Sequence, residues 1–308
     1  MTYSIISRSK LEGAHRLDAE YYQPEYLDLD KKIKDGEYAR FGDIISILTD
    51  YTSNGSFAGL KQNVHVFDNN GFAKWIRIQN LDNEDFENNI RYVDKKSFDF
   101  LNKSVLLGDE LLISKTGEYL GKAYLMPKLL EKSTLADNIF LIHLKKESLK
   151  EFIITFINSS IGRKLLLRRL QGTGQPTIIK ESLRDYLIPI PDEVLNRGIK
   201  FNYKEYKKEL NNSKFLYQQA ESLLLEELGL QNFEVENSLF SIINLSEVKN
   251  AKRIDAEYYQ VKYEKLSEKI KQNNEKKLGD LVSLKKGIEV GAEEYQEDGK
   301  VFIRVSSM

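Results

Sequence analysis

The chain has 308 residues, of which 41% are hydrophobic and 30% are charged, which is enough for a hydrophobic core beneath a well-solvated surface. It contains no cysteine, which excludes disulfide scaffolds, thiolate zinc sites and cysteine nucleophiles. The formal net charge of −1 neither indicates nor excludes a nucleic-acid partner, because acidic surfaces can offset a basic cleft. The first residues lack the apolar stretch of a signal peptide, and no segment has the roughly 18 apolar residues of a membrane span, so we expect a cytoplasmic protein.

In chain order, the first predicted element is a short helix over residues 16–35. Residues 41–145 are predicted to be rich in strands, because short β-type runs alternate there with turn residues such as Asp68–Gly71. These runs cover residues 44–48, 75–78, 111–114, 124–126 and 139–142.

From residue 148 to residue 171 the spacing of apolar side chains becomes helical, and this segment ends in a basic run. A glycine-rich loop, residues 172–177, follows and carries polar groups suited to hydrogen bonds with phosphates or bases. Leu187–Pro191 is predicted to be an extended edge, because each proline excludes the helical conformation from the residue before it.

A long helix is predicted over residues 202–230, since this segment has no proline and its one glycine, Gly229, is a suitable C-terminal cap. Large side chains recur in it every seven residues beside a weaker companion seam, a pattern typical of a coiled coil. The seam residues are Tyr203, Tyr206, Leu210, Tyr217, Ala220 and Leu224. We expect this face to pack against the other helix of a repeat or against a second chain.

The sequence contains an internal repeat of domain length. Arg16–Gln23 recurs as Arg253–Gln260, and Phe41–Ile47 recurs as Leu278–Leu284, both displaced by 237 residues (253 − 16). A third match relates Ile76–Ile78 to Ile303–Val305. This period is far longer than the roughly 20 to 50 residues of a solenoid unit. We therefore expect one complete unit followed by the start of a second, with a helix over residues 254–272 and the first strands.

The motifs of common catalytic sites are missing. Gly117–Lys122 has three residues between its glycines where the ATP-binding motif has four, and Ala123 stands where a magnesium-binding hydroxyl belongs. His15, His65 and His143 lie too far apart in the sequence to indicate a metal site. Neither a methyltransferase tetrapeptide nor a nuclease-like carboxylate spacing is found, and we expect no catalysis, no resident metal and no cofactor.

Several short motifs, taken in order, resemble the specificity subunit of type I restriction–modification systems. They are Arg16–Tyr22, Phe41–Ile44, Gly108–Gly117 with Gly121–Lys122, Gly172–Ile178 and Ile188–Pro191, followed by the coiled-coil helix. Each motif is weak by itself, whereas their order and the domain-length repeat make the combination specific.

The resemblance implies an α+β fold, in which a mixed, strand-rich target-recognition domain is followed by a long coiled-coil helix. The expected divisions are an N-terminal segment (1–40), the recognition domain (41–196), the long helix (200–230) and the start of a second repeat (231–308).

The resemblance also implies that the recognition domain reads one half of a bipartite site on double-stranded DNA. Methyltransferase subunits, which carry the S-adenosylmethionine, and a restriction and translocase subunit dock on such a protein, which is not itself an enzyme.

The expected DNA-binding residues are basic side chains for phosphates and polar side chains on loops for base edges. The phosphate candidates are Lys115, Lys122, Arg163, Lys164, Arg168 and Lys180. The base-reading candidates are Gln79, Asn80, Thr116, Tyr119, Gln175 and Thr177. Arg77 is a further expected DNA-binding residue. Each of these residues also fits a structural turn, cap or solvated surface.

Two other functions fit the same sequence. One is a coiled-coil adaptor that binds protein and has no DNA specificity, and the other is a DNA-modifying enzyme with an unfamiliar active site. The incomplete repeat also has two interpretations, a truncated subunit or a half-subunit that pairs with a copy of itself.

Overall fold

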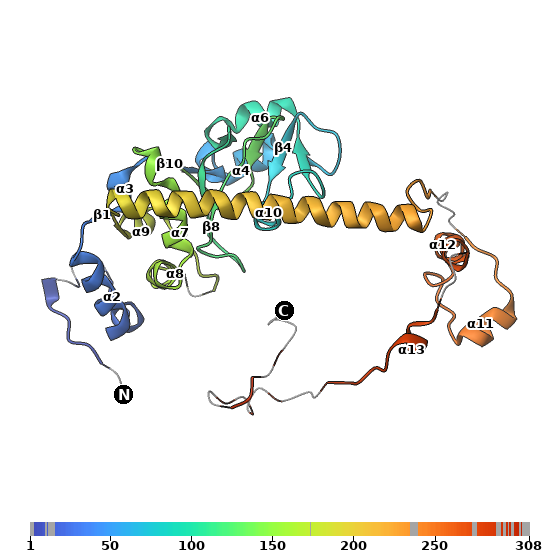
Figure 1. The fold of residues 1–308 in the computed structure, drawn as a ribbon. Coiled ribbons are helices and arrows are strands. Elements are labelled where there is room, and N and C mark those ends of the chain that lie inside the picture. Colours follow the sequence, from blue (N-terminus) through green and yellow to red (C-terminus); the bar gives the residue numbers. More distant parts are fainter. Residues whose placement is uncertain are drawn as a thin grey trace. The chain divides into compact units, whose positions relative to one another are not determined.

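The computed structural model describes residues 3–9, 11, 16–172, 174–234, 240–272, 276–287, 291, 294, 296, 299–301 and 303. The chain divides into two compact units, Met1–Glu209 (unit 1) and Leu210–Met308 (unit 2). The division falls within the long helix α10, so each unit contains part of that helix (Figure 1). None of the helices in the described ranges combines the length and the apolar character needed to cross a membrane.

The strands of unit 1 form a two-stranded, a four-stranded and a five-stranded sheet, with the orders β1-β11, β2-β10-β7-β8 and β3-β5-β4-β9-β6. Neighbouring strands are antiparallel except β4 and β9, which are parallel. The strands are β1 (Tyr38–Arg40), β2 (Ile45–Asp50), β3 (Val66–Phe67), β4 (Ala73–Ile76), β5 (Arg91–Val93), β6 (Val105–Leu106), β7 (Leu111–Ser114), β8 (Ala123–Leu125), β9 (Ser133–Leu135), β10 (Ile139–Leu144) and β11 (Leu187–Pro189).

Helices are distributed along the whole chain. The α-helices are α2 (Pro24–Lys34), α3 (Phe41–Ile44), α4 (Phe57–Asn63), α5 (Ile78–Asn83), α6 (Lys95–Phe100), α7 (Lys150–Asn158), α8 (Ser160–Leu167), α9 (Lys180–Arg184), α10 (Glu193–Glu227), α11 (Leu245–Ala251), α12 (Val261–Lys271) and α13 (Leu278–Leu281). Short 3₁₀ turns are η1 (Ala19–Tyr22), η2 (Tyr51–Asn54), η3 (Asn102–Ser104) and η4 (Glu147–Leu149).

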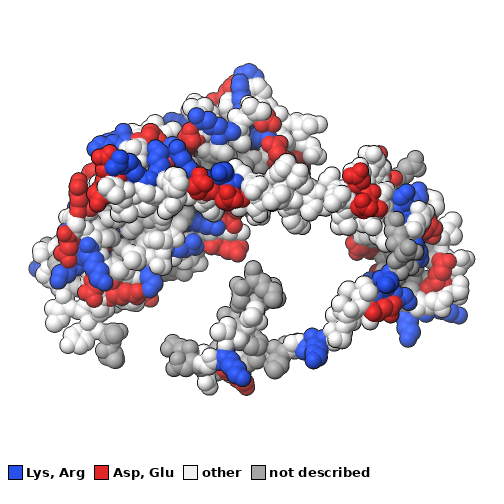
Figure 2. Space-filling model, in the orientation of Figure 1, with Lys and Arg blue, Asp and Glu red and all other residues white. Residues whose placement is uncertain are grey.

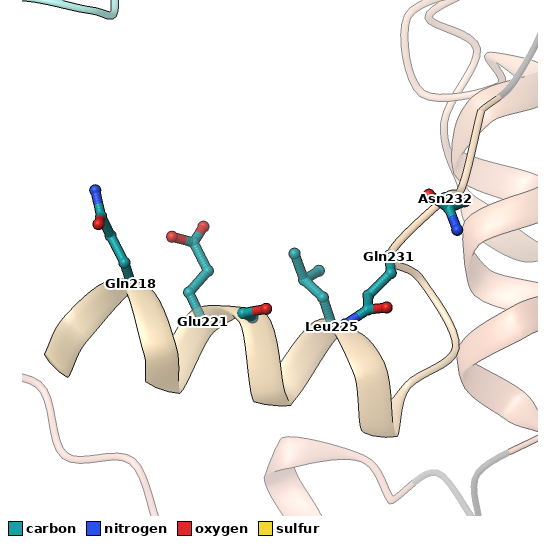
Figure 3. A pocket seen from close by; sticks show the side chains of 6 residues that line it. Gln218, Glu221, Leu225, Gln231 and Asn232 are labelled. Atoms are coloured by element: carbon teal, nitrogen blue, oxygen red, sulfur yellow. The ribbon is translucent and has the colours of Figure 1, made fainter. Parts of the chain in front are cut away.

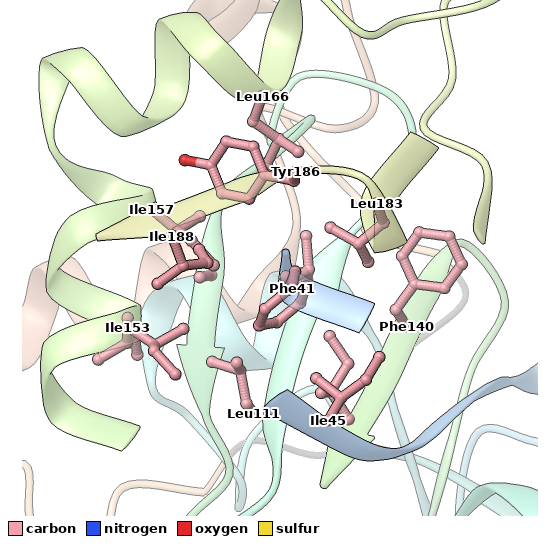
Figure 4. Close-up of a cluster of buried hydrophobic side chains, with 14 of the residues drawn as sticks. Phe41, Ile45, Leu111, Phe140, Ile153, Ile157, Leu166, Leu183, Tyr186 and Ile188 are labelled. Atoms are coloured by element: carbon pink, nitrogen blue, oxygen red, sulfur yellow. The ribbon is translucent and has the colours of Figure 1, made fainter. Parts of the chain in front are cut away.

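The four-stranded sheet is buried on both faces, because its central strands β7 and β10 are apolar at nearly every position. Side chains alternate between the faces of a strand, so Leu111 and Ile113 pack in one cluster and Leu112 packs in another. The first cluster is closed by α7, α8, α3 and β11, and Phe41 and Tyr186 lie at its centre (Figure 4). This sheet is therefore the inner layer of unit 1.

The second cluster joins the four-stranded sheet to the five-stranded sheet through Ile76 of β4 and Leu135 of β9. The opposite face of the five-stranded sheet carries Trp75 and Val93, which pack with residues of α4 and of the segment after α6. Two sheets with helices on their outer faces thus form the core of unit 1.

The mixed α+β class and the long helix that were predicted from the sequence are confirmed. The helix α10 begins at Glu193, earlier than the predicted residue 202, and ends at Glu227. Gly229 follows with φ +65°, and its N–H donates to Glu226 O, so it caps the helix end as predicted.

Several predicted elements are broken into shorter ones. The helix predicted over residues 16–35 consists of η1 and α2, because Pro24 begins a new helix. The helix predicted over residues 148–171 is interrupted at Ser159, which has ψ 158° and whose Oγ accepts a hydrogen bond from Gly162 N to cap α8. The strand predicted over residues 75–78 ends at Ile76, since Ile78 begins α5.

Unit 2 reproduces helices of unit 1 at the same displacement of 237 residues: α12 corresponds to α2, and α13 to α3. The predicted helix over residues 254–272 is shorter than expected, because turns precede α12. Residues 282–284 form no strand, whereas the equivalent β2 pairs with β10 of its own domain. Of the third repeat match, residues 304–305 lie outside the described residues.

A glycine at the contact between α7 and α8 provides a test of this packing. A Cβ atom on Gly162 would lie 1.9 Å from Phe156 O, and Gly162 O already accepts a hydrogen bond of 2.8 Å from Tyr186 Oη. We expect Gly162→Ala to lower the free energy of unfolding of unit 1 by about 3 kcal/mol, because α8 must move away from α7.

Urea denaturation followed by the fluorescence of Trp75, the single tryptophan, measures this change. The matched control is Gly198→Ala in α10, where a Cβ atom would meet nothing within 4 Å. The control should stabilise the protein by about 0.5–1 kcal/mol, because alanine favours the helix. Equal unfolding curves for the two variants would contradict the close approach of α7 and α8.

Candidate nucleic-acid interface

The loops that follow β2 and β7 and the loop that precedes β10 lie at the same end of the four-stranded sheet. This part of unit 1 is termed the loop end, and it comprises residues 50–54, 115–122, 137–138, 171–172 and 174–180. Asp50, at the end of β2, pairs with Phe140, and Ser114, at the end of β7, pairs with Ile139. Both partners lie at the start of β10, the strand between β2 and β7. Thr177 Oγ1 and Ile178 N both donate to Lys115 O, at 3.2 and 3.1 Å, and so attach the glycine-rich loop to the same edge.

A buried carboxylate holds the lysines of the loop end in place. Asp50 is 3% exposed, and its two oxygens accept hydrogen bonds from Lys115 Nζ at 2.8 Å and Lys180 Nζ at 3.0 Å. Burial alone would raise the pKa of Asp50, but the hydrogen bonds from Lys115 and Ser53 outweigh burial and hold that pKa well below its usual range. Asp50 is therefore an anion that ties together β2, β7 and α9.

The polar candidates of the loop end differ in how free their side chains are. Thr177 is committed to Lys115 O, whereas Thr116 is half-buried and Gln175 is exposed. Gly117 and Gly174 border open space, since a Cβ atom on either would meet nothing within 4 Å. Gln175 is therefore the exposed candidate base reader of the loop end.

A second polar cluster joins the β7–β8 hairpin to α5. Lys122 forms an ion pair with Asp82, and its Nζ lies 5.8 Å from the Tyr119 ring centroid and 5.7 Å from that of Tyr124. Tyr124 Oη donates to Asp82 Oδ1 at 3.1 Å, and burial followed by the Asp82 carboxylate raises the pKa of Tyr124. This cluster contains two of the predicted residues, Lys122 and Tyr119, and a third, Gln79, is exposed on α5, the helix that carries Asp82.

Arg77 and Asn80 maintain the turn into α5. Asn80 is 3% exposed, and its Oδ1 accepts a hydrogen bond of 3.1 Å from Arg77 N. Arg77 Nη2 donates to Asn89 O at 2.5 Å. Their predicted contact with DNA stays a prediction, and the structure uses both side chains for local structure.

The basic run on and after α8 lies against the N-terminal segment. Lys164 forms an ion pair with Glu25, and Arg168 forms one with Asp30. The Arg168 side chain is 2% exposed, so a contact between Arg168 and a phosphate would require α2 to leave α8. Arg163, also on α8, is half-buried.

Basic side chains on the face drawn in Figure 2 are interspersed with acidic ones. This distribution agrees with the ion pairs of Lys115, Lys122 and Lys164. Asp50 and Asp82 are not among the residues predicted from the sequence, because carboxylates repel phosphates and the predicted residues were basic or uncharged polar ones. The sequence signal for Asp50 is its position at the end of β2, directly before the turn of residues 51–54.

Unit 2 contains an open groove of about 420 Å³ at the end of α10 (Figure 3). Its lining residues are Gln218, Glu221, Ser222, Leu225, Gln231 and Asn232. Glu221 is the one ionisable side chain in this lining, so the groove provides no acid–base pair. Over the described part of the chain, no group of three or more His, Asp or Glu side chains could hold a metal ion.

The model of the type I restriction modification DNA specificity domain family matches residues 33–194. No curated protein sequence matches the chain.

Among solved structures, the chain is similar to the type I restriction–modification S subunit from M. genitalium, with 13% identity over 63% of this chain and 44% of that chain and a TM-score of 0.42. It is also similar to the HsdS subunit from Thermoanaerobacter tengcongensis, with 16% identity over 65% of this chain and 51% of that chain and a TM-score of 0.39. The chain spans about half the length of these two proteins.

The contacts of Asp50 predict that Asp50→Asn strongly lowers the stability of the protein. Asp50→Asn leaves Lys115, whose side chain is 13% exposed, without its anionic partner, so we expect a loss of about 3–5 kcal/mol in the free energy of unfolding at pH 7. The depressed pKa of Asp50 stabilises the native protein above the unfolded pKa of about 3.9, and this contribution is lost as the pH falls towards the folded pKa.

Urea denaturation monitored by Trp75 fluorescence at pH 7 and at pH 3 measures both effects. The wild-type protein should lose more stability on acidification than Asp50→Asn, which lacks this contribution at either pH. Asp99→Asn, which removes an exposed i,i+4 pair with Lys95, is the matched control and should change stability by less than about 0.5 kcal/mol. If both substitutions had equal effects, Asp50 would not be the anchor of the loop end.

Proposed function

The chain belongs to the type I restriction modification DNA specificity domain family, and we propose that unit 1 binds duplex DNA through its loop end. The family confirms the resemblance drawn from the motifs, and it is a family of specificity domains rather than catalytic domains. Unit 1 contains the whole of the matched segment, residues 33–194.

The observation that supports this proposal best is the gathering of lysines and an exposed glutamine at the ends of a rigid sheet. Lys115 and Lys180 are held by the buried Asp50, and Gln175 lies on the loop attached to Lys115 O. Phosphate contacts give affinity and position the protein, and an exposed glutamine can pair with the N6 and N7 edge of adenine. Strand ends that hold the loops rigidly suit such a reading surface.

In this proposal one recognition domain reads one half of a bipartite site. Methyltransferase subunits bind the assembly and supply S-adenosylmethionine chemistry, a restriction and translocase subunit joins them, and this chain performs no chemistry itself. This arrangement agrees with the lack of catalytic motifs in the sequence and with the type of domain that the family represents.

The exposed face of α10 is the surface that we propose for helix packing between chains. Tyr206, Tyr217 and Leu224 are 56%, 74% and 58% exposed, and α10 has no buried residue. A symmetric pair of such helices would present two equal recognition domains to a palindromic site.

The reading surface is tested by Gln175→Ala. We expect the variant to weaken binding to the preferred duplex by about 1–3 kcal/mol, roughly 5- to 150-fold in Kd, or to change the preferred sequence, with no decrease in melting temperature. The preferred duplex is first selected from randomised DNA with the wild-type chain and its methyltransferase subunit, and Kd is measured by fluorescence anisotropy.

Gln218→Ala on α10 is the matched control and should leave Kd unchanged. Unchanged affinity and site choice in Gln175→Ala would remove this residue from the reading surface. Binding with neither sequence preference nor salt dependence would contradict the proposed function and would favour the protein-binding adaptor.

The helix pairing is tested by Tyr217→Glu and Leu224→Glu. Each places a charge on the proposed apolar seam, so we expect the mass measured by light scattering to fall from that of a dimer to that of a monomer. Ser222→Glu, on the opposite side of the heptad, is the control and should leave the mass unchanged. A monomeric wild-type chain would overturn the homodimer while leaving the DNA-binding proposal to its own test.

A further inference from the structure

The repeated sequence motif has a defined local structure in unit 1. Arg16 Nε donates to Asp18 Oδ1 at 2.7 Å, and Tyr22 Oη donates to Arg16 O at 3.2 Å. The rings of Tyr21 and Tyr22 meet edge to face with centroids 4.9 Å apart. This structure, continued by α2, is termed the first motif (residues 16–34).

The second copy of the motif, residues 253–271, has the same structure within unit 2. Arg253 Nε donates to Asp255 Oδ1 at 2.8 Å, and Tyr259 Oη donates to Arg253 O at 2.9 Å. The rings of Tyr258 and Tyr259 are again edge to face with centroids 4.9 Å apart. The second motif therefore forms these contacts in a different environment from that of the first.

The first motif binds the C-terminal end of α8, where Arg168 lies. The guanidinium carbon of Arg168 lies 4.5 Å from the Tyr21 ring centroid and 5.7 Å from that of Tyr26, and Arg168 also pairs with Asp30. Arg16 Nη1 donates to two backbone carbonyls just beyond α8, at 3.3 and 3.0 Å. The motif thus binds both the cation and the open carbonyls of a helix C-terminus.

The equivalent surface of the second motif is partly exposed, and the cation beside the Tyr263 ring is the motif's own Lys262, whose Nζ lies 4.9 Å from the ring centroid. Tyr258 and Tyr263 are 46% and 44% exposed, whereas Tyr21 is 9% exposed. No residue of α12 is buried among those that the structure describes. Tyr258, Tyr263 and Arg253 have the positions that Tyr21, Tyr26 and Arg16 have in the first motif, and within the described ranges no helix end buries the two rings.

The two motifs differ in charge at two positions, and this difference determines which helix each motif can bind. Glu25, which pairs with Lys164, is replaced by Lys262, and Asp30, which pairs with Arg168, is replaced by Ser267. An α8 helix from a second copy of this chain would meet Lys262 with its own lysine, and its buried arginine would lose the carboxylate partner. The second motif thus disfavours binding of an α8 helix from a second copy, although it keeps the tyrosine rings that an arginine could contact.

We propose that the second motif is a preformed docking site for the C-terminal turn of a protein helix that carries an arginine for Tyr258 and Tyr263 and an acidic residue for Lys262. The acidic residue takes the position that Lys164 has on α8, four residues before the arginine. Because Glu25 of the first motif is replaced by Lys262 in the second, the two motifs bind different helices, although their sequences are otherwise similar.

The test uses the full chain and labelled peptides of residues 159–171, held helical by a side-chain staple, in fluorescence anisotropy at low salt. The native peptide is compared with its Lys164→Glu and Lys164→Glu/Arg168→Ala forms. We expect the Lys164→Glu peptide to bind about fivefold more tightly than the native peptide. Removing the arginine from the peptide, or making Tyr258→Ala in the chain, should weaken binding at least about tenfold.

A charge reversal in the chain completes the test. Lys262→Glu should invert the preference, so that the native peptide binds more tightly than Lys164→Glu. Lys249→Glu on α11 makes the same change of net charge outside the motif and should leave the preference unchanged. Equal affinity of both peptides for the wild-type chain, binding that survives Tyr258→Ala, or inversion by Lys249→Glu would each overturn the proposal.

Discussion

A sheet that is apolar on both faces can present polar side chains only at its edges and beyond its strand ends. The four-stranded sheet of unit 1 is such a sheet, with Leu111 and Ile113 on one face and Leu112 on the other. The turns after β2 and β7 must therefore accommodate the polar residues, and the antiparallel pairing with β10 brings these turns to one edge. The loop end is a consequence of this double burial.

The lysines of the loop end are organised by a carboxylate at its centre. Because Asp50 is buried and ionised, Lys115 and Lys180 are fixed at the ends of different elements instead of extending freely into solvent. This pairing also reduces the net positive charge that the loop end presents, in accord with the chain's formal net charge of −1. Affinity for a polyanion would then depend on geometry and on exchange of ion pairs, and less on a broad basic surface.

The two copies of the motif separate what a sequence dictates locally from what packing adds. The Arg–Asp bridge and the paired tyrosines form in both units, since their partners lie within six residues of each other. Burial differs, because α8 covers only the first motif with Arg168. The same local structure therefore serves as a core element in one unit and as an exposed surface in the other.

The sequence by itself determined the mixed fold class, the long helix with its glycine cap, the repeat and the family, because these depend on local propensity, periodicity and motif order. The tertiary structure alone decided which polar residues are available. Arg168 and Asn80 appeared equivalent to Gln175 in the sequence, yet Arg168 is buried against Tyr21, Asn80 caps a turn and Gln175 is exposed. Burial and pairing of a charged side chain depend on residues that are distant in the sequence, such as Asp30, 138 positions from Arg168, and no local pattern encodes them.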